Sequence, residues 1–251
     1  MAEGDTILRL ARRLEAALAG ETIEATAPSP RGREAGIERL DGMRLDAAET
    51  RGKHLLLHFD ELVLHSHLGI SGGWHLYRRG APWRKPRASA WAVLAGEHEE
   101  AVQFGGPSLR VLTAARLRRD PQLAHLGPDL LAEGFDADAV ASSMRSDPTR
   151  DLGDALLDQG LVAGIGNIFK SEACFAARVD PWRRVGDLSD AELSDVLLGA
   201  RRLMLGAVAG GRHRAAVYRR RGPCTACGGP IASRGQGDAN RTTYWCPNCQ
   251  R

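Results

Sequence analysis

Hydrophobic residues near the start of the chain repeat with the period of an α-helix. The apolar positions at three- and four-residue steps are Ile7, Leu10, Ala11, Leu14 and Leu18. This spacing places them on one face and predicts a helix over residues 5–19. Gly20 is a suitable stop signal for it.

A different pattern follows from about residue 22 to residue 115. Short apolar runs at 54–59, 62–68 and 90–95 are separated by Gly, Pro and charged turns. Within the second run the alternating residues Leu62, Leu64, Ser66 and Leu68 share one face of a strand. The pattern predicts an all-β region of short strands, either a sandwich or a barrel.

Pro and Gly residues at 120–134 mark a domain boundary, after which the helical period returns over 136–209. Segments at 152–159 and 190–208 are the clearest helices, with a break between them near Pro181. The last 30 residues are polar and too few to hold a core, so they require a disulfide or a metal.

Composition is that of an ordinary water-exposed globular protein, with 251 residues, 43% hydrophobic and 26% charged. No apolar run approaches the ~20 residues that span a bilayer, so we expect no membrane segment and a cytoplasmic location. The net charge is +3, but residues 211–251 hold eight Arg and one Asp. This +7 tail on a −4 remainder favours a polyanion partner such as nucleic acid, the alternative being a solvated basic tail.

Four of the five cysteines form two close pairs near the C-terminus, Cys224/Cys227 and Cys246/Cys249, with eighteen residues between the pairs. This spacing is typical of a four-cysteine zinc site on a β-hairpin. Four thiolates leave no open position for water, so the zinc should be structural and not catalytic. The alternative is a set of free thiols. Cys174 lies among Ala and Phe and is expected to be buried.

The chain begins Met1-Ala2-Glu3-Gly4-Asp5-Thr6. Ala2 is small, so we expect Met1 to be removed, leaving a free α-amine beside the Glu3 carboxylate. An α-amine has a pKa near ~7.7–8.0, so part of it is neutral and nucleophilic at physiological pH. Such an amine can form a Schiff base with a sugar carbon. Taken alone, these residues fit an ordinary flexible terminus better.

A glycine-rich turn joins two predicted helices within residues 156–173. We expect the first helix to end near Gln159 and the second to begin at Asn167 or the next residue. Glycines at 164 and 166 let the backbone approach a large ligand, and amides at a helix N-terminus attract anions. Asn167 is a suitable N-cap that could also donate to phosphate. A tight inter-helix turn without a ligand is the alternative.

Four motifs together resemble the formamidopyrimidine-DNA glycosylase / endonuclease VIII family. They are Glu3–Thr6, Thr50-Arg51-Gly52-Lys53-His54-Leu55, the glycine hairpin at 156–173, and Arg241-Thr242-Thr243-Tyr244-Trp245-Cys246-Pro247 with Cys249-Gln250. They lie in the family's order from end to end. The resemblance implies an α+β protein with three domains. These are an N-terminal β-sandwich with flanking helices over 1–122, a helix–two-turn–helix domain over 123–215 and a four-cysteine zinc finger over 216–251.

The resemblance also implies an activity and its residues. The Ala2 amine would attack C1′ of the sugar, Glu3 would act as general acid and base, and elimination would then cut the strand. Lys53 would contact the damaged site as a proton donor. The DNA-binding residues would be Asn167, Arg241, Lys170, Gly164, Gly166 and Ile70. Of these, Ile70 would be a wedge between bases, unless its side chain folds back onto the core.

Three departures from the family pattern bear on activity. Ala2 replaces the usual Pro, which removes the ring that fixes the direction of the nitrogen. Residues 103–110 lack the usual Arg and aromatic that fill the void left by a flipped base, so Leu109 or Arg110 would have to substitute. The stretch from Gly210 to Cys224 is too short for the long lid of the 8-oxoguanine branch, which places the chain nearer endonuclease VIII.

The sequence therefore predicts a DNA glycosylase and abasic-site lyase of base-excision repair that acts on oxidised bases, with pyrimidines favoured. The predicted partner is double-stranded damaged DNA, the predicted cofactor is one structural Zn²⁺, and the predicted state is a monomer near the nucleoid. The alternative is a damaged-DNA or abasic-site binding protein that Ala2 has made inactive.

Overall fold

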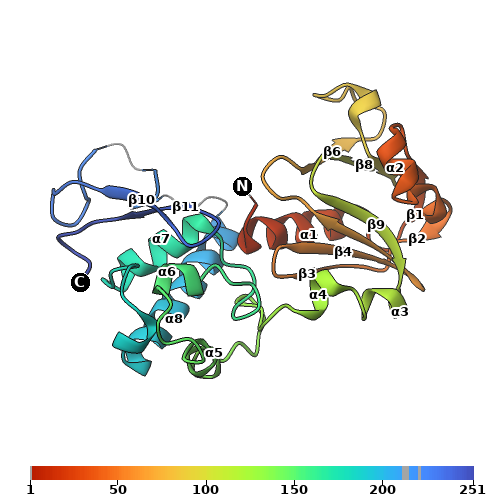
Figure 1. The fold of residues 1–251 in the computed structure, drawn as a ribbon. Coiled ribbons are helices and arrows are strands. Elements are labelled where there is room, and N and C mark those ends of the chain that lie inside the picture. Colours follow the sequence, from red (N-terminus) through yellow and green to blue (C-terminus); the bar gives the residue numbers. More distant parts are fainter. Residues whose placement is uncertain (1, 211–214, 220–221) are drawn as a thin grey trace. The chain divides into compact units, whose positions relative to one another are not determined.

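A computed structural model describes residues 2–210, 215–219 and 222–251 of the chain. The chain divides into two compact units, Met1–Ala124 and His125–Arg251 (Figure 1). The three-domain division at 1–122, 123–215 and 216–251 stays a prediction. No helix among the described residues has both the length and the apolar character needed to cross a membrane.

The first unit begins with helix α1, and short strands follow it. Its elements are α1 (Gly4–Leu18), β1 (Thr22–Thr26), α2 (Pro30–Glu34), η1 (Ile37–Leu40), β2 (Met43–Arg44), β3 (Ala47–Arg51), β4 (His54–Phe59), β5 (Leu62–His67), β6 (Gly73–Arg78), η2 (Arg87–Ser89), β7 (Ala92–Ala95), β8 (Glu99–Phe104), β9 (Ser108–Thr113), α3 (Ala114–Leu117) and α4 (Pro121–Ala124). The predicted helix at 5–19 and the strand at 54–59 are confirmed.

The strands of the first unit form two antiparallel sheets. One has the order β2-β1-β7-β8-β6 and the other the order β3-β4-β5-β9. Apolar side chains from both sheets and from α1 form one core, which includes Leu14, Ile23, Leu57, Leu64 and Leu94. The unit is therefore the predicted sandwich and not a barrel.

The sequence pattern of β5 shows only one of its two buried faces. Leu62, Leu64 and Ser66 lie on the core side as predicted. Val63 and His65 on the opposite face are also buried, at 1% and 0% exposure. A strand covered on both faces can carry a histidine where alternation alone would suggest a solvated residue.

The second unit is helical with a terminal hairpin. Its elements are α5 (Ala137–Met144), α6 (Leu152–Ala155), α7 (Asn167–Ala176), η3 (Val185–Asp187), α8 (Asp190–Gly210), β10 (Ala232–Gln236) and β11 (Arg241–Trp245). A second apolar core joins α5, α7 and α8, and it includes Cys174, which is buried as predicted. Burial raises the pKa of that thiol to about 12, so it stays protonated.

Two local predictions in the second unit are wrong. Helix α6 ends at Ala155 and does not reach Gln159, because the Gln159 side chain satisfies the backbone of the following turn. Its amide donates to the carbonyls of Leu157 and Ile165, and its oxygen accepts from the Gly164 N–H. The N-cap of α7 is Gly166, and Asn167 is the first residue inside the helix.

Candidate active site and metal centre

Antiparallel pairing of β4 and β5 gathers several predicted site residues at one end of the four-stranded sheet. His54 lies opposite His67, so the Gly52-Lys53 turn before β4 and the loop after β5 are at the same end. Gly52 has φ +59°, a left-handed conformation that glycine adopts without strain. Lys53 thus lies in a tight turn and not at the start of a strand.

The backbone at Ala2 is held against this same end of the sheet. The Ala2 nitrogen donates to the Gly69 carbonyl at 3.2 Å, directly after β5. Glu3 occupies the N-cap position of α1 and is 1% exposed. Its carbonyl accepts from the N–H groups of Thr6 and Ile7, which begins the helix. The first unit therefore places Ala2 and Glu3 beside the loop that carries Ile70.

Ile70 is the most exposed of the large apolar side chains in the described part of the chain, at 69%. The loop around it packs closely on the loop between β8 and β9, since a Cβ added to Gly72 would lie 2.8 Å from Cα of Gly106. With 69% of its surface exposed, the Ile70 side chain does not fold back onto the core in this structure. Its role as a wedge between bases stays a prediction.

Neither residue suggested as a substitute void filler is suited to that role in the structure. Leu109 is 4% exposed and belongs to the sandwich core. Arg110 points to the opposite face of β9, where its Nη2 lies 2.8 Å from Asp120 Oδ2 and 3.0 Å from His65 Nδ1. This expectation is wrong because both side chains are held by partners inside the first unit.

Two histidines of β5, His65 and His67, have depressed pKa values. Burial and the adjacent Arg110 guanidinium lower the pKa of His65 to about 4, only partly offset by Asp120. Burial lowers the pKa of His67 as well, and the Lys53 ammonium adds to this. Both imidazoles are therefore neutral at neutral pH. Sequence reasoning missed them, although the His-x-His pattern of 65–67 in a strand was available.

The depressed pKa of His65 predicts a loss of stability in acid. The unfolded chain takes up the proton near pH 6.5 and the folded chain only near pH 4, so this stability is present above 6.5 and lost as the pH falls toward 4. Between pH 7.5 and 4.5, urea denaturation of the wild type should lose about 2.5 kcal/mol more than that of His65→Gln. His98→Gln, at an exposed position, is the matched control and should behave as the wild type. Equal losses in all three proteins would contradict the assignment.

In the second unit, the glycine hairpin presents the start of α7 to the terminal hairpin. Gly164 has φ +105°, and Gly166 precedes the helix in an extended conformation. Asn167 is 7% exposed, and its Nδ2 donates to the Thr242 carbonyl at 2.6 Å. Its Oδ1 has no hydrogen-bond partner, so this oxygen can accept one more hydrogen bond.

Lys170 has a different environment from the one predicted. It is fully buried, and its Nζ donates to Thr243 Oγ1 at 2.6 Å. Thr243 in turn donates to Gln236, whose amide donates to the Pro181 carbonyl. Lys170 therefore joins α7 to the hairpin and does not face solvent. Arg241, by contrast, is exposed at the start of β11.

A buried carboxylate holds the segment that leads to the hairpin. Glu172 is 2% exposed and accepts backbone N–H groups from Ala216, Val217 and Tyr218 at 2.7–2.9 Å. Sequence reasoning missed this contact because Glu172 and residue 217 are 45 positions apart. Arg212, Arg214, Arg220 and Arg221 of the predicted basic tail lie outside the described residues.

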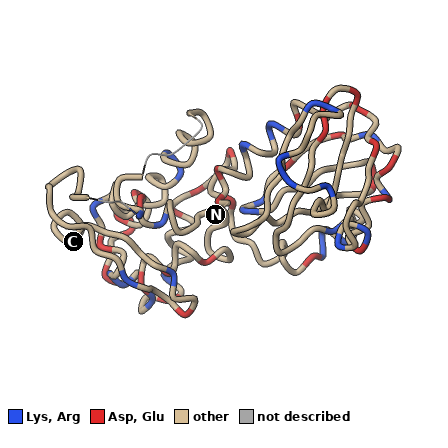
Figure 2. Tube along the Cα trace, turned by 90° about the horizontal axis from the view of Figure 1, so that it is seen from above, with Lys and Arg blue, Asp and Glu red and all other residues tan. Residues whose placement is uncertain are grey.

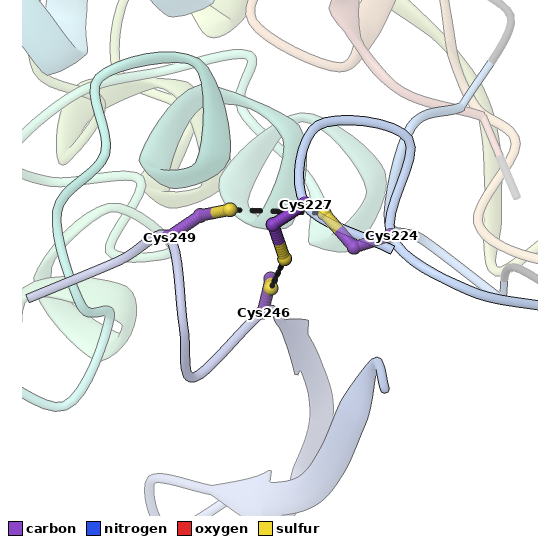
Figure 3. Close-up of side chains that lie close together, drawn as sticks. All are labelled: Cys224, Cys227, Cys246 and Cys249. Carbon is purple, nitrogen blue, oxygen red and sulfur yellow. Dashed lines mark hydrogen bonds between the residues drawn. The ribbon is translucent and has the colours of Figure 1, made fainter. Parts of the chain in front are cut away.

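The four predicted cysteine ligands meet at one point (Figure 3). Their sulfur atoms all lie within 4.8 Å of one another. Cys224 Sγ is 3.8 Å from Cys249 Sγ, and Cys227 Sγ is 3.5 Å from Cys246 Sγ. Tetrahedral coordination with metal–sulfur bonds of ~2.3 Å separates sulfurs by about 3.8 Å. The donor set therefore fits one metal ion.

A basic segment of the first unit was also missed. Arg78, Arg79, Arg84, Lys85 and Arg87 are exposed. No acidic residue lies between positions 78 and 96. Figure 2 colours the cations and the acids along the chain. Two of the cations lie over aromatic rings, Lys85 over Phe104 at 5.2 Å and Arg87 over Trp83 at 4.9 Å. These contacts order part of a positive surface.

Comparison with known proteins gives matches over most of the chain. Residues 1–107 match the model of the formamidopyrimidine-DNA glycosylase N-terminal domain, and residues 126–217 match the model of the H2TH domain of the same family. A Streptomyces coelicolor protein named "Probable endonuclease 8 2" is 37% identical over all of this chain and 94% of its own length.

Further matches agree with these. A Mycolicibacterium smegmatis protein named as a DNA-(apurinic or apyrimidinic site) lyase is 35% identical over 100% of this chain and 99% of its own length. The fold matches a crystal structure of the Lactococcus lactis formamidopyrimidine-DNA glycosylase with a TM-score of 0.86, at 23% identity over 99% of each chain.

Proposed function

This chain belongs to the formamidopyrimidine-DNA glycosylase family, and we propose that it is a DNA glycosylase and abasic-site lyase of base-excision repair. The observation that carries the proposal is the position of the Ala2 nitrogen. It is hydrogen-bonded to Gly69 and followed by the buried Glu3, at the sheet end that holds Lys53. A nucleophile, an acid–base group and a cation thus belong to one unit.

The reaction follows from the chemistry of these groups. The neutral Ala2 amine attacks C1′, the bond to the damaged base breaks, and the base leaves with the electron pair and a proton. Opening of the sugar ring gives a Schiff base between Ala2 and C1′. Removal of a C2′ proton then breaks the C3′–O bond, and the strand is cut. Water releases the amine. Glu3 moves the protons, a role that general acid–base catalysis makes worth about 10²–10⁴-fold.

The Gly69 carbonyl fixes the direction of the Ala2 nitrogen, which the ring of the usual Pro would otherwise do. A proline ring fixes the direction of its nitrogen covalently. In the structure the peptide N–H of Ala2 donates to the Gly69 oxygen at 3.2 Å. After removal of Met1 the primary amine has one hydrogen more than a proline nitrogen, and it can donate this hydrogen to the same oxygen. The lone pair of the amine then keeps a defined direction. This contact supports activity with Ala at position 2.

Each unit contains residues that we propose to bind DNA. Lys53 and the exposed Arg241 supply cations for phosphates, and Asn167 with the Gly164–Gly166 turn supplies amides at a helix start. The exposed Ile70 has the position and character of a wedge. The basic residues at 78–87 add to the non-specific affinity. Lys170 is left out of this set because it is buried.

Oxidised pyrimidines are the proposed lesions. The support is the endonuclease 8 name of the relative at 37% identity and the short stretch from Gly210 to Cys224. Residues 211–214 and 220–221 of that stretch lie outside the described part of the chain. A monomeric state and a cytoplasmic location stay predictions.

We propose Zn²⁺ as the ion of the four-cysteine site. Four thiolates in a tetrahedron are the usual donor set of a structural Zn²⁺ site. The ion would tie the two ends of the β10–β11 hairpin together, and so hold Arg241 and the partners of Asn167 in place. It has no part in the chemistry at Ala2.

Borohydride trapping tests the function. The Met1-free protein is incubated with a duplex containing one abasic site, with thymine glycol, or with 8-oxoguanine, in the presence of borohydride. We expect a covalent adduct with the abasic duplex and the thymine glycol duplex, and little with 8-oxoguanine. Tight, salt-sensitive binding without any adduct would overturn the enzyme assignment and favour an inactive damaged-DNA binder.

A further inference from the structure

Three histidines and one arginine form a continuous polar network, the histidine–arginine network, on the face of the four-stranded sheet that points away from the sandwich core. Arg110 Nη2 lies 3.0 Å from His65 Nδ1, and His65 Nε2 lies 2.8 Å from His54 Nδ1. The His54 ring stacks on His67, with ring centroids 4.6 Å apart and planes at 30°. The histidine–arginine network ends at the Lys53 turn, since His54 follows Lys53 directly.

The hydrogen positions in this network follow from one residue. A guanidinium has donors only, so His65 Nδ1 must accept from Arg110 and cannot carry a proton. Neutral His65 therefore carries its proton on Nε2 and donates it to His54 Nδ1. His54 Nδ1 is then an acceptor as well, which leaves the proton of neutral His54 on Nε2. One arginine thus sets the tautomers of two imidazoles in series.

The Arg110 end of the histidine–arginine network is held rigidly. Asp120 Oδ2 accepts from Arg110, while its Oδ1 accepts the Gln122 N–H at 2.9 Å in the first turn of α4. The Gln122 side chain also accepts from Arg110, at 3.1 Å. Both His65 and Asp120 are buried, at 0% and 5% exposure. In a buried network of this kind each side chain has only one fully hydrogen-bonded arrangement, so the position of Arg110 fixes the positions of His65 and His54.

We propose that Arg110, His65 and His54 are positioning residues that hold Lys53 and His67 in register with the Ala2 amine. The inference rests on the proposed function. The three residues do not touch substrate. They hold the Lys53 turn through two neutral imidazoles, and these keep the ammonium of Lys53 apart from the guanidinium of Arg110. Among the described residues, the charged and titratable groups that act on His65 are Arg110, Asp120, His54 and His67.

A first experiment compares three variants in strand cleavage of an abasic duplex. His65→Leu cannot accept from Arg110 or donate to His54, and we expect kcat to fall about 10²-fold, the usual effect of a misplacement near 1 Å, with KM changed less. His65→Gln keeps one acceptor and one donor and should recover most of the loss. His58 lies on the same face of β4 as His54 but outside the histidine–arginine network, so His58→Leu is the matched control and should keep the wild-type rate.

Full activity of folded His65→Leu, or an equal loss in His65→Gln and His65→Leu, would overturn the proposal. Thermal denaturation of each variant shows whether it is folded. If His65→Leu does not fold, kcat of His65→Gln is compared with kcat of Arg110→Gln. Only Arg110→Gln removes the charged donor to His65, so the proposal requires the larger loss of kcat in Arg110→Gln.

A second experiment needs no activity and so separates this inference from the proposed function. Nitrogen-15 NMR of the DNA-free protein at pH 7.5 distinguishes the two imidazole tautomers. We expect His65 and His54 to be neutral and protonated on Nε2, and His54 to change its tautomer ratio in Arg110→Gln. His65 protonated on Nδ1, or charged, would contradict the histidine–arginine network even in a fully active enzyme.

Discussion

A variant that retains Met1 forms no Schiff base with abasic DNA. Ala2→Leu places a bulky residue after Met1, so the methionine stays and the nitrogen of residue 2 remains an amide. The lone pair of an amide is delocalised into the carbonyl and cannot attack C1′. Borohydride trapping should therefore fall to the detection limit, the largest effect that we expect from any single substitution in this chain. Intact mass of the protein reports whether Met1 is present.

Ala2→Gly and Ala2→Pro are the matched controls, because both side chains allow removal of Met1. Ala2→Gly keeps a primary amine that can donate to the Gly69 carbonyl, as the Ala2 N–H does in the structure, so trapping should persist. Ala2→Pro replaces that bond by a ring and should trap at least as well as the wild type. Trapping by protein that retains Met1 would show that another amine, such as that of Lys53, is the nucleophile.

Loss of the metal is expected to release the terminal hairpin from α7. Cys246→Ser removes a ligand that is fully buried, and a structural zinc site contributes about 10–16 kcal/mol of apparent binding free energy at pH 7. Without the ion, β10 and β11 have too small a core to stay folded. Asn167 and Lys170 then lose Thr242 and Thr243 as partners. Hydrogen exchange of residues 232–245 should rise to the rate of an unfolded chain.

The same variant should bind abasic DNA more weakly, because Arg241 is no longer held at the start of β11. Its first unit should keep the wild-type exchange pattern, since the site belongs to the second unit. Cys174→Ala is the control, because this thiol is buried in the helical core and lies outside the cluster. Metal analysis should find one zinc per chain in the control and none in Cys246→Ser. An unchanged exchange rate in the metal-free hairpin would show that it folds without the ion.

Patterns within short stretches of sequence were enough for several elements and ligands. The period of Ile7, Leu10, Leu14 and Leu18 depends only on helical geometry, and α1 forms where that period predicts. The two Cys-x-x-Cys pairs can each chelate one side of a metal ion because of their local spacing, and the structure brings the four sulfurs together. Ile70 is exposed, as its position between glycines in a loop predicted.

Burial and partner choice could not be predicted in this way. Lys170 looks like a surface cation in sequence, but packing of α7 on β11 buries it against Thr243, 73 positions away. Arg110 looked like a candidate void filler until the register of β9 with β5 placed it opposite His65. Pairing between distant strands decides such contacts, and no local period encodes it.

The sequence by itself determined the family, the α+β class and the four clustered cysteines, because each rests on a motif of adjacent or regularly spaced residues, and the reactive end that it indicates stays a prediction. Only the tertiary structure decided that the Gly69 carbonyl holds the Ala2 nitrogen, and that Arg110 reaches the Lys53 turn through His65 and His54. These contacts join residues 67 and 45 positions apart, and they exist only once the sheets have paired and water has been removed from between them.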